Sequence, residues 1–274
     1  RLWTTAGADL EAQLYAGHPI KNSTLGLSLH FAARFLARFY VAGRYRFSRF
    51  YAEDTYKNGL SAEWNQHELY LAAGVRLGPL WLSGHYSAIS DGSETYSTTH
   101  QWAASADVAL GSGGRFGHVA LRAGASHYDD LTVLRIAPSY RLRLFGRLGL
   151  EAELALSQVS STDGAGHFQL RGASLVRFAT ASLTLDARFS WGSLYLGGRY
   201  GDSVRPANLA LGVTANSYDL VGPGLWAGAD LRVGTRARLR LGYALSKLTT
   251  PISQTGPSAD TDSTLQMFSL GIAW

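Results

Sequence analysis

Apolar and polar residues alternate one by one along most of this chain. In the last ten residues, large apolar side chains occupy every second position, at Phe268, Leu270, Ile272 and Trp274, with small or polar residues between them. This period of two is that of a β-strand, in which successive side chains point to opposite faces. A soluble protein seldom exposes a strand with such an apolar row, because the row promotes aggregation. The pattern therefore predicts a strand whose apolar face is not in contact with water.

The composition agrees with a sheet that meets lipid on one face and water on the other. Hydrophobic residues make up 46% of the chain, yet its mean hydropathy is -0.04 and only 16% of its residues are charged. No segment approaches the roughly 18 consecutive apolar residues of a transmembrane helix. A soluble β-sandwich would also alternate, but here every strand has an apolar face and no second sheet remains to cover it. We therefore predict an all-β fold, a transmembrane antiparallel up-and-down β-barrel that forms a single domain over residues 1–274.

The alternation predicts about fourteen strands, with twelve or sixteen as alternatives. Short turns such as 78–79 and 234–236 alternate with longer polar segments, which include 53–64, 91–98, 201–217 and 249–261. We expect residues 157–178 to form either a long loop or a strand pair that projects beyond the membrane. The strands are centred on residues 4–15, 25–31, 39–47, 69–77, 82–88, 102–110, 119–125, 134–144, 148–156, 181–189, 194–200, 225–233, 239–245 and 265–274.

The last strand resembles the C-terminal signature of Gram-negative outer-membrane β-barrels. That signature has an aromatic last residue and apolar residues at every second position before it, which Phe268, Leu270, Ile272 and Trp274 match. The usual last residue is Phe, so Trp274 is a departure. The resemblance implies an outer-membrane location, surrounding lipid and lipopolysaccharide, and an insertion signal that the barrel-assembly machinery reads. An even number of strands predicts that both termini lie in the periplasm.

Charged residues fall on the face opposite the apolar row. Each charge would cost about 2–4 kcal/mol in the middle of the hydrocarbon, so they are predicted to line a lumen. The spacing across short turns places Arg141 opposite Glu151 and Asp230 opposite Arg240. Such pairs can brace the wall or create a transverse field that selects solutes, and the sequence leaves both open. The predicted lumen-facing residues are Arg44, Arg46, Arg76, Arg122, Arg135, Arg141, Arg143, Arg188, Arg199, Arg232, Arg238 and Arg240, with Asp9, Glu11, Glu68, Asp107, Glu151, Glu153, Asp186 and Asp230.

The excess of arginine and the small residues on the inward face favour a channel for hydrophilic solutes, anionic or sugar-like. No signal peptide is visible before Arg1, so the chain is predicted to be a mature barrel or the C-terminal part of a longer protein. The alternative is the barrel of an export or envelope-assembly complex for polysaccharide or surface protein, with periplasmic partners. A structural membrane anchor is a further hypothesis.

Catalytic and cofactor signals are weak. The eight histidines are scattered and cysteine is absent, so no metal or other cofactor is expected, and no nucleic-acid partner is expected either. The glycine-rich segment 111–117 lacks the ending of a phosphate-binding loop and is predicted to be a hairpin turn. His85 and Ser87 resemble the His-x-Ser of outer-membrane phospholipases and lipid A deacylases, but that pattern continues with Asn, and Ala88 follows here. Both residues have the inward phase, so we predict that the protein is not an enzyme.

Overall fold

The structure is a computed structural model of the whole chain. It describes residues 2–17, 21–54, 60–91, 99–111, 116–127, 131–144, 146–161, 175–204, 207–208, 213–214, 220–250 and 261–274. In these residues, no helix is both long and apolar enough to cross a membrane.

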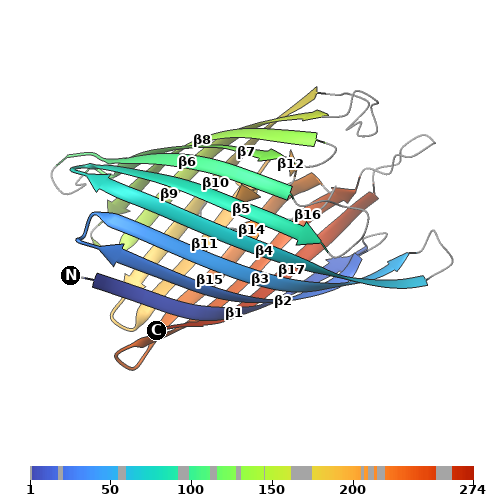
Figure 1. Cartoon of the computed structure of the whole chain (residues 1–274), viewed down its shortest axis with the longest axis horizontal. Coiled ribbons are helices and arrows are strands. Elements are labelled where there is room, and N and C mark those ends of the chain that lie inside the picture. Colours follow the sequence, from blue (N-terminus) through green and yellow to red (C-terminus); the bar gives the residue numbers. More distant parts are fainter. Residues whose placement is uncertain are drawn as a thin grey trace.

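Fourteen long strands of the described chain form one closed antiparallel barrel (Figure 1). Each strand pairs with its neighbours in sequence, and β17 pairs with β1. The predicted all-β barrel and its strand number are confirmed. Three two-residue strands lie between β11 and β15: β12 (Ser203–Val204) pairs with β15, and β13 (Ala207–Asn208) pairs with β14 (Val213–Thr214). The barrel strands are β1 (Leu2–Ala16), β2 (Lys21–Phe35), β3 (Phe39–Asp54), β4 (Leu60–Leu77), β5 (Leu80–Asp91), β6 (Thr99–Ala109), β7 (His118–His127), β8 (Leu131–Leu144), β9 (Leu148–Ser161), β10 (Leu175–Phe189), β11 (Gly192–Tyr200), β15 (Leu220–Val233), β16 (Ala237–Thr250) and β17 (Thr261–Ala273).

The pairing of β17 with β1 closes the barrel. Its register runs from Gly7 opposite Ala273 to Ala16 opposite Thr264. Two further backbone hydrogen bonds extend the pairing to the last residue, from Trp274 N to Ala6 O at 2.9 Å and from Ala6 N to Trp274 O at 3.0 Å. The terminal segment is therefore a strand of the wall, hydrogen-bonded on both sides.

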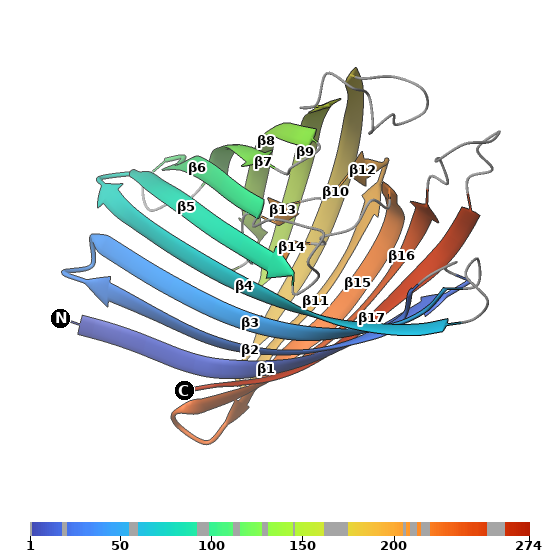
Figure 2. The same ribbon diagram turned by 45° about the vertical axis from the view of Figure 1, so that its right-hand side comes forward.

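The two ends of the barrel differ. At one end, which we call the turn end, short turns join consecutive strands, including 36–38, 78–79 and 234–236. Gly78 and Gly234 have φ angles of 62° and 70°, a left-handed conformation that glycine adopts without steric cost. Both chain termini lie at this end (Figures 1 and 2). We call the opposite end the loop end.

The outer face of the barrel is apolar. Leu183, Leu185 and Leu270 expose 48%, 51% and 48% of their surface, and Phe268 and Ile272 are similarly exposed. On the opposite face, Arg46 and Glu68 are only 4% and 3% exposed. This arrangement is the reverse of a soluble protein and matches a wall whose outside contacts lipid.

Several strands are longer than the alternation indicated, so the expected loop at 53–64 was wrong. The strand β3 continues to Asp54 and β4 begins at Leu60. An ion pair between Arg49 and Glu63 and the stacked rings of Phe50 and Trp64, with centroids 5.0 Å apart, join the two strands there. Beyond the hydrocarbon both faces of a strand meet water, so the apolar alternation that marks the spanning part is lost.

The same extension occurs at two other hairpins. Of the two alternatives for residues 157–178, the described residues support the projecting strand pair. The strand β9 continues to Ser161 and pairs with β10 from Leu175. The segment 249–261 is likewise shorter than expected, since Thr250 still pairs with Thr261. Residues 162–174 and 251–260 lie outside the described residues, as do 92–98 of the expected loop after β5.

Two neighbouring residues of β10 test which face meets lipid. Replacing Leu183 on the outer face with Arg should lower the free energy of unfolding by about 2–4 kcal/mol, because its charge would enter hydrocarbon. Replacing Ser182 with Arg should change it by less than about 1 kcal/mol, since Ser182 lies opposite Glu153 on the inner face. Denaturant unfolding in lipid vesicles measures both. Equal destabilisation by the two variants would contradict the assignment of the faces.

Candidate functional site

A buried charged cluster lies on the inner face across β1, β3 and β4. Arg46 places Nη2 2.5 Å from Glu11 Oε1 and Nη1 3.4 Å from Glu68 Oε1. Gln66 Nε2 donates to the same Glu68 oxygen at 2.6 Å. We call Glu11, Arg46, Gln66 and Glu68 the Arg46 cluster. Its ion pairs are nearly closed to solvent, so removal of one partner would leave a buried charge.

A glycine makes the Arg46 cluster possible. Glu11 and Arg46 belong to strands that are separated by β2, and their guanidinium–carboxylate contact crosses that strand. At this place β2 has Gly26, which lies opposite Glu11 in the register. A Cβ at Gly26 would lie 3.2 Å from Arg46 Nε, so a larger residue would push the guanidinium away.

A second network crosses the seam between β17 and β1. Asp9 Oδ2 lies 3.1 Å from His30 Nδ1, and Asp9 Oδ1 lies 3.8 Å from Arg240 Nη1. His30 Nε2 is also 3.1 Å from Arg240 Nη2. Arg240 is on β16, so this contact passes over β17 at Gly271, where a Cβ would collide with the Asp9 carboxylate. The small residues that alternate with the apolar row of β17 therefore leave room for charged pairs.

A third group, the Glu153 cluster, lies on β7, β8 and β9. Arg122 contacts Glu153 at 2.5 Å and Glu151 at 3.3 Å. Arg135 reaches the other oxygen of Glu153 at 2.9 Å. Arg141 donates to Glu151 Oε2 through Nε at 2.9 Å and Nη2 at 2.6 Å, as the turn spacing predicted.

The other sequence-predicted pair is only partly as expected. Asp230 and Arg240 are opposite in the register, but Arg240 makes its ion pair with Asp9, and Asp230 contacts Arg238 at 3.9 Å. Arg240 instead interacts with Asp9 and His30 in the seam network. Counting residues across the turn 234–236 could not predict this, because Asp9 and His30 belong to other strands. The predicted residue Arg44 joins that network through Ser28, because Arg44 donates to Ser28 Oγ at 3.1 Å and Ser28 Oγ donates to Asp9 Oδ2 at 3.4 Å.

The remaining predicted arginines, except Arg199, gather at the turn end. Around this mouth, exposed arginines occupy the inner-face phase of six strands and also three turns, and we call these nine residues the arginine rim. Asp107, Asp186 and Asp230 are the acidic residues beside them within the described chain. Four of the nine were not among the predicted lumen-facing residues, because three are in turns and Arg34 lies beyond the predicted end of the second strand. The rim consists of Arg34, Arg76, Arg143, Arg188, Arg232 and Arg238 on strands, with Arg38, Arg147 and Arg236 in turns.

Toward the loop end, the inner face also holds buried apolar residues beside buried polar ones, which was not predicted. Ile89, Val159 and Leu248 have the inward phase and are 0%, 2% and 2% exposed. Val133 lies opposite Val159 in the register. We call these four residues with Phe178 the apolar inner band. Ile89 could have been predicted from the sequence, because it lies two residues after Ser87 on the same strand and so has the same inward phase.

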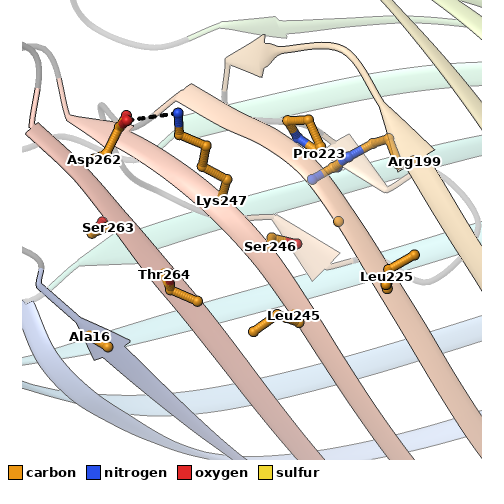
Figure 3. A pocket seen from close by; sticks show the side chains of 11 residues that line it. Ala16, Arg199, Pro223, Leu225, Leu245, Ser246, Lys247, Asp262, Ser263 and Thr264 are labelled. Atoms are coloured by element: carbon orange, nitrogen blue, oxygen red, sulfur yellow. Dashed lines mark ion pairs between the residues drawn. The ribbon is translucent and has the colours of Figure 1, made fainter.

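A pocket of about 540 Å³ lies in the wall formed by β15, β16 and β17 (Figure 3). The strand β15 is irregular here between Val221 and Gly224, and Pro223 has no backbone donor for the ladder. Arg199, on β11, donates to Gly222 O at 3.0 Å, and the ion pair of Lys247 with Asp262 at 2.7 Å also borders the pocket. The predicted lumen residue Arg199 therefore stabilises an interruption of the wall.

His85 and Ser87 are not arranged as a catalytic pair. Both have the inner-face phase, as predicted, but His85 interacts with Tyr70 Oη at 2.6 Å and with Ser83 Oγ at 2.8 Å. The hydroxyl of Ser87 is buried and forms no hydrogen bond within the described chain.

The described residues contain no group of three His, Cys, Asp or Glu side chains that could hold a metal ion. Leu110 N donates a hydrogen bond to Gly117 O between β6 and β7, where the hairpin turn was predicted, and residues 112–115 of that turn lie outside the described residues.

Solved structures share this fold at low sequence identity. The CymD monoaromatic hydrocarbon channel has a TM-score of 0.63 at 8% identity, over 98% of this chain and 87% of CymD. The Pseudomonas putida toluene transporter TodX has a TM-score of 0.58 at 9% identity, over 99% of this chain and 88% of TodX. OmpT of Vibrio cholerae has a TM-score of 0.52 at 9% identity, over 100% of this chain and 97% of OmpT.

Sequence comparison adds no closer relative, because no protein-family model and no curated protein matches the chain. The chain therefore shares the closed barrel fold of these outer-membrane proteins, and its apolar outer face agrees with the resemblance of its last strand to such barrels.

The Arg46 cluster can be tested by removing its cation. Replacing Arg46 with Leu should lower the free energy of unfolding by about 3–5 kcal/mol, because Glu68 would remain buried without its partner. Replacing both Glu11 and Glu68 with Gln in that variant should restore most of the loss. Arg141→Leu is the matched control, with an expected loss below about 1 kcal/mol, since its pair with Glu151 is half-exposed. Equal losses for Arg46 and Arg141 in denaturant unfolding would contradict the role of burial.

The absence of lipid hydrolysis is a separate prediction. Because His85 bonds to Ser83 and Tyr70, the purified barrel should release no acyl chains from phospholipid or lipid A. Chromatography of radiolabelled lipid after incubation with wild type and Ser87→Ala measures this. Acyl release by wild type that disappears in the variant would overturn the prediction.

Proposed function

We propose that this protein is an outer-membrane channel for small hydrophilic solutes, with a modest preference for anions and with its turn end in the periplasm. The observation that carries this proposal is a water-accessible charged inner face. The side chains of Arg141, Arg240 and Glu151 are 47%, 41% and 26% exposed although they belong to the inside of a closed wall. Charged groups can be exposed there only if the lumen contains water.

The preference for anions rests on the balance of charge. In the middle of the lumen, the three arginines of the Glu153 cluster, Arg122, Arg135 and Arg141, form ion pairs with the two carboxylates of Glu151 and Glu153. Most of this charge is neutralised within the cluster, and salt screens the rest beyond about 8 Å at physiological ionic strength. The selectivity is therefore small and increases as salt is lowered.

A second candidate is a pathway for apolar solutes. The apolar inner band favours it, because Ile89, Val133, Val159, Phe178 and Leu248 place buried aliphatic and aromatic groups on the inner face toward the loop end. The names of CymD and TodX describe hydrocarbon channels, which agrees with this candidate at the level of the fold. A barrel that transfers an apolar solute between vesicles but conducts no ions would favour it over the first proposal.

The channel proposal is tested by the reversal potential of single channels in a planar bilayer under a KCl gradient. Wild type should conduct and favour chloride weakly. Replacing Arg122 and Arg135 with Gln should shift selectivity toward potassium, because Glu153 loses both of its cations. Arg49→Gln is the control without effect, since its pair with Glu63 lies outside the lumen.

Heat-modifiable migration in gels confirms that each variant is folded. A cation-selective wild type would contradict the anion preference, and a folded barrel that never conducts would contradict the channel itself.

A further inference from the structure

The positive charge of this protein is concentrated at one mouth of the barrel. Within the described residues, the nine arginines of the arginine rim and the three aspartates beside them sum to a formal charge of +6. The whole chain has a formal charge of +5, so everything outside the rim sums to −1. The barrel therefore has an electric field along its axis, with the positive end at the turns, which attracts anions to that mouth.

The rim contains like charges in direct opposition. Arg232 on β15 and Arg238 on β16 are opposite each other in the register, a placement that destabilises a sheet. The turn between them adds Arg236, and the nearby acid is Asp230, 3.9 Å from Arg238. Deeper in the lumen, Glu151 stands opposite Arg141 in the equivalent position. The wall thus places a carboxylate opposite an arginine in the lumen, whereas the rim places one arginine opposite another.

Most rim side chains belong to the inside of the mouth. Six of the nine arginines are on strands with the inner-face phase, and three are in turns. Arg34 lies over the ring of Trp81, with 5.5 Å between its Cζ and the ring centroid, and Arg76 Nε donates to Gly78 O at 3.1 Å. These contacts hold the two guanidinium groups at the turn end, on the inner-face side of the wall.

We propose that the arginine rim captures linear polyanions, of the class of carboxylated polysaccharides, at the turn end and leads them into the lumen. The proposal rests on the channel function and gives it a direction. The rim arginines are distributed over β2, β4, β8, β10, β15 and β16, so one small anion contacts only one or two of them. A chain with charges at regular intervals contacts several at once and releases their counterions, which strengthens binding and makes it depend steeply on salt.

The test is sided block of the channel by polygalacturonate, with neutral dextran of equal length as the comparison polymer. The protein has no cysteine, so Thr235→Cys in a rim turn reports orientation when a bulky thiol reagent is added to either side. Polygalacturonate should block from the Thr235 side at low concentration, and at least about tenfold more should be needed from the other side. Raising the salt concentration should abolish the difference.

Three rim residues on separate strands provide the variants. Replacing Arg76, Arg143 and Arg232 with Gln should raise the half-blocking concentration about tenfold, because each exposed ionic contact contributes about two- to fivefold. The same positions replaced with Lys should retain block, and Arg49→Gln at the loop end should change nothing. Equal block from both sides, or block that the Gln variant does not alter, would overturn the proposal.

Binding separates this inference from the channel proposal. If the folded barrel does not conduct, fluorescein-labelled polygalacturonate is titrated with the detergent-solubilised protein. Binding that is lost in the Gln variant and kept in the Lys variant supports the rim even without a channel. Absence of binding to wild type overturns it, and tighter binding of an acidic folded protein than of the polymer would show a docking surface.

Discussion

The closure of the sheet by β17 and β1 is the constraint on which the other features of this barrel depend. Hydrocarbon offers no partner to a backbone N–H or C=O, so a sheet can cross a membrane only if it has no free edge. The pairing from Gly7 opposite Ala273 to Ala16 opposite Thr264 removes both edges. Once the wall is closed, each strand has one face toward lipid and one toward the lumen, and the alternation of the sequence follows from that geometry.

The closed wall also determines how charges are arranged. Polar groups that cannot face lipid lie together inside, where the Arg46 cluster, the seam network and the Glu153 cluster pair arginines with carboxylates on neighbouring strands and on strands further along the sheet. Gly26 and Gly271 give these long contacts space by removing a side chain from the intervening strand. The clusters therefore join strands that share no backbone hydrogen bonds as well as strands that are neighbours in the wall. At the turn end, arginines are not matched by an equal number of carboxylates, because nine arginines have only three aspartates beside them in the described chain.

The sequence predicts the wall better than the interior. Alternation identifies the strands because lipid requires an apolar side chain at every second position, and the turn at residues 145–147 gives the pair of Arg141 with Glu151 correctly. It underestimates β3 and β4, since beyond the membrane both faces meet water and the pattern is lost. It also misassigns Arg240, whose partner Asp9 lies more than two hundred residues earlier in the chain and meets it only after closure. The arginines in turns were not predicted to line the mouth, because the residues of a turn do not alternate between an inner and an outer face.

The seam has a consequence for the time course of folding. Its two strands are the first and last of the barrel, so the contact between Gly7 and Ala273 spans almost the full length of the chain. Contacts of such long sequence separation form late, because a large loop entropy must be overcome before they give any stabilisation. Until then β1 and β17 both present unpaired edges that can join other chains. The open sheet of fourteen strands, before its seam has formed, is therefore the species most exposed to aggregation, although the finished wall has no free edge.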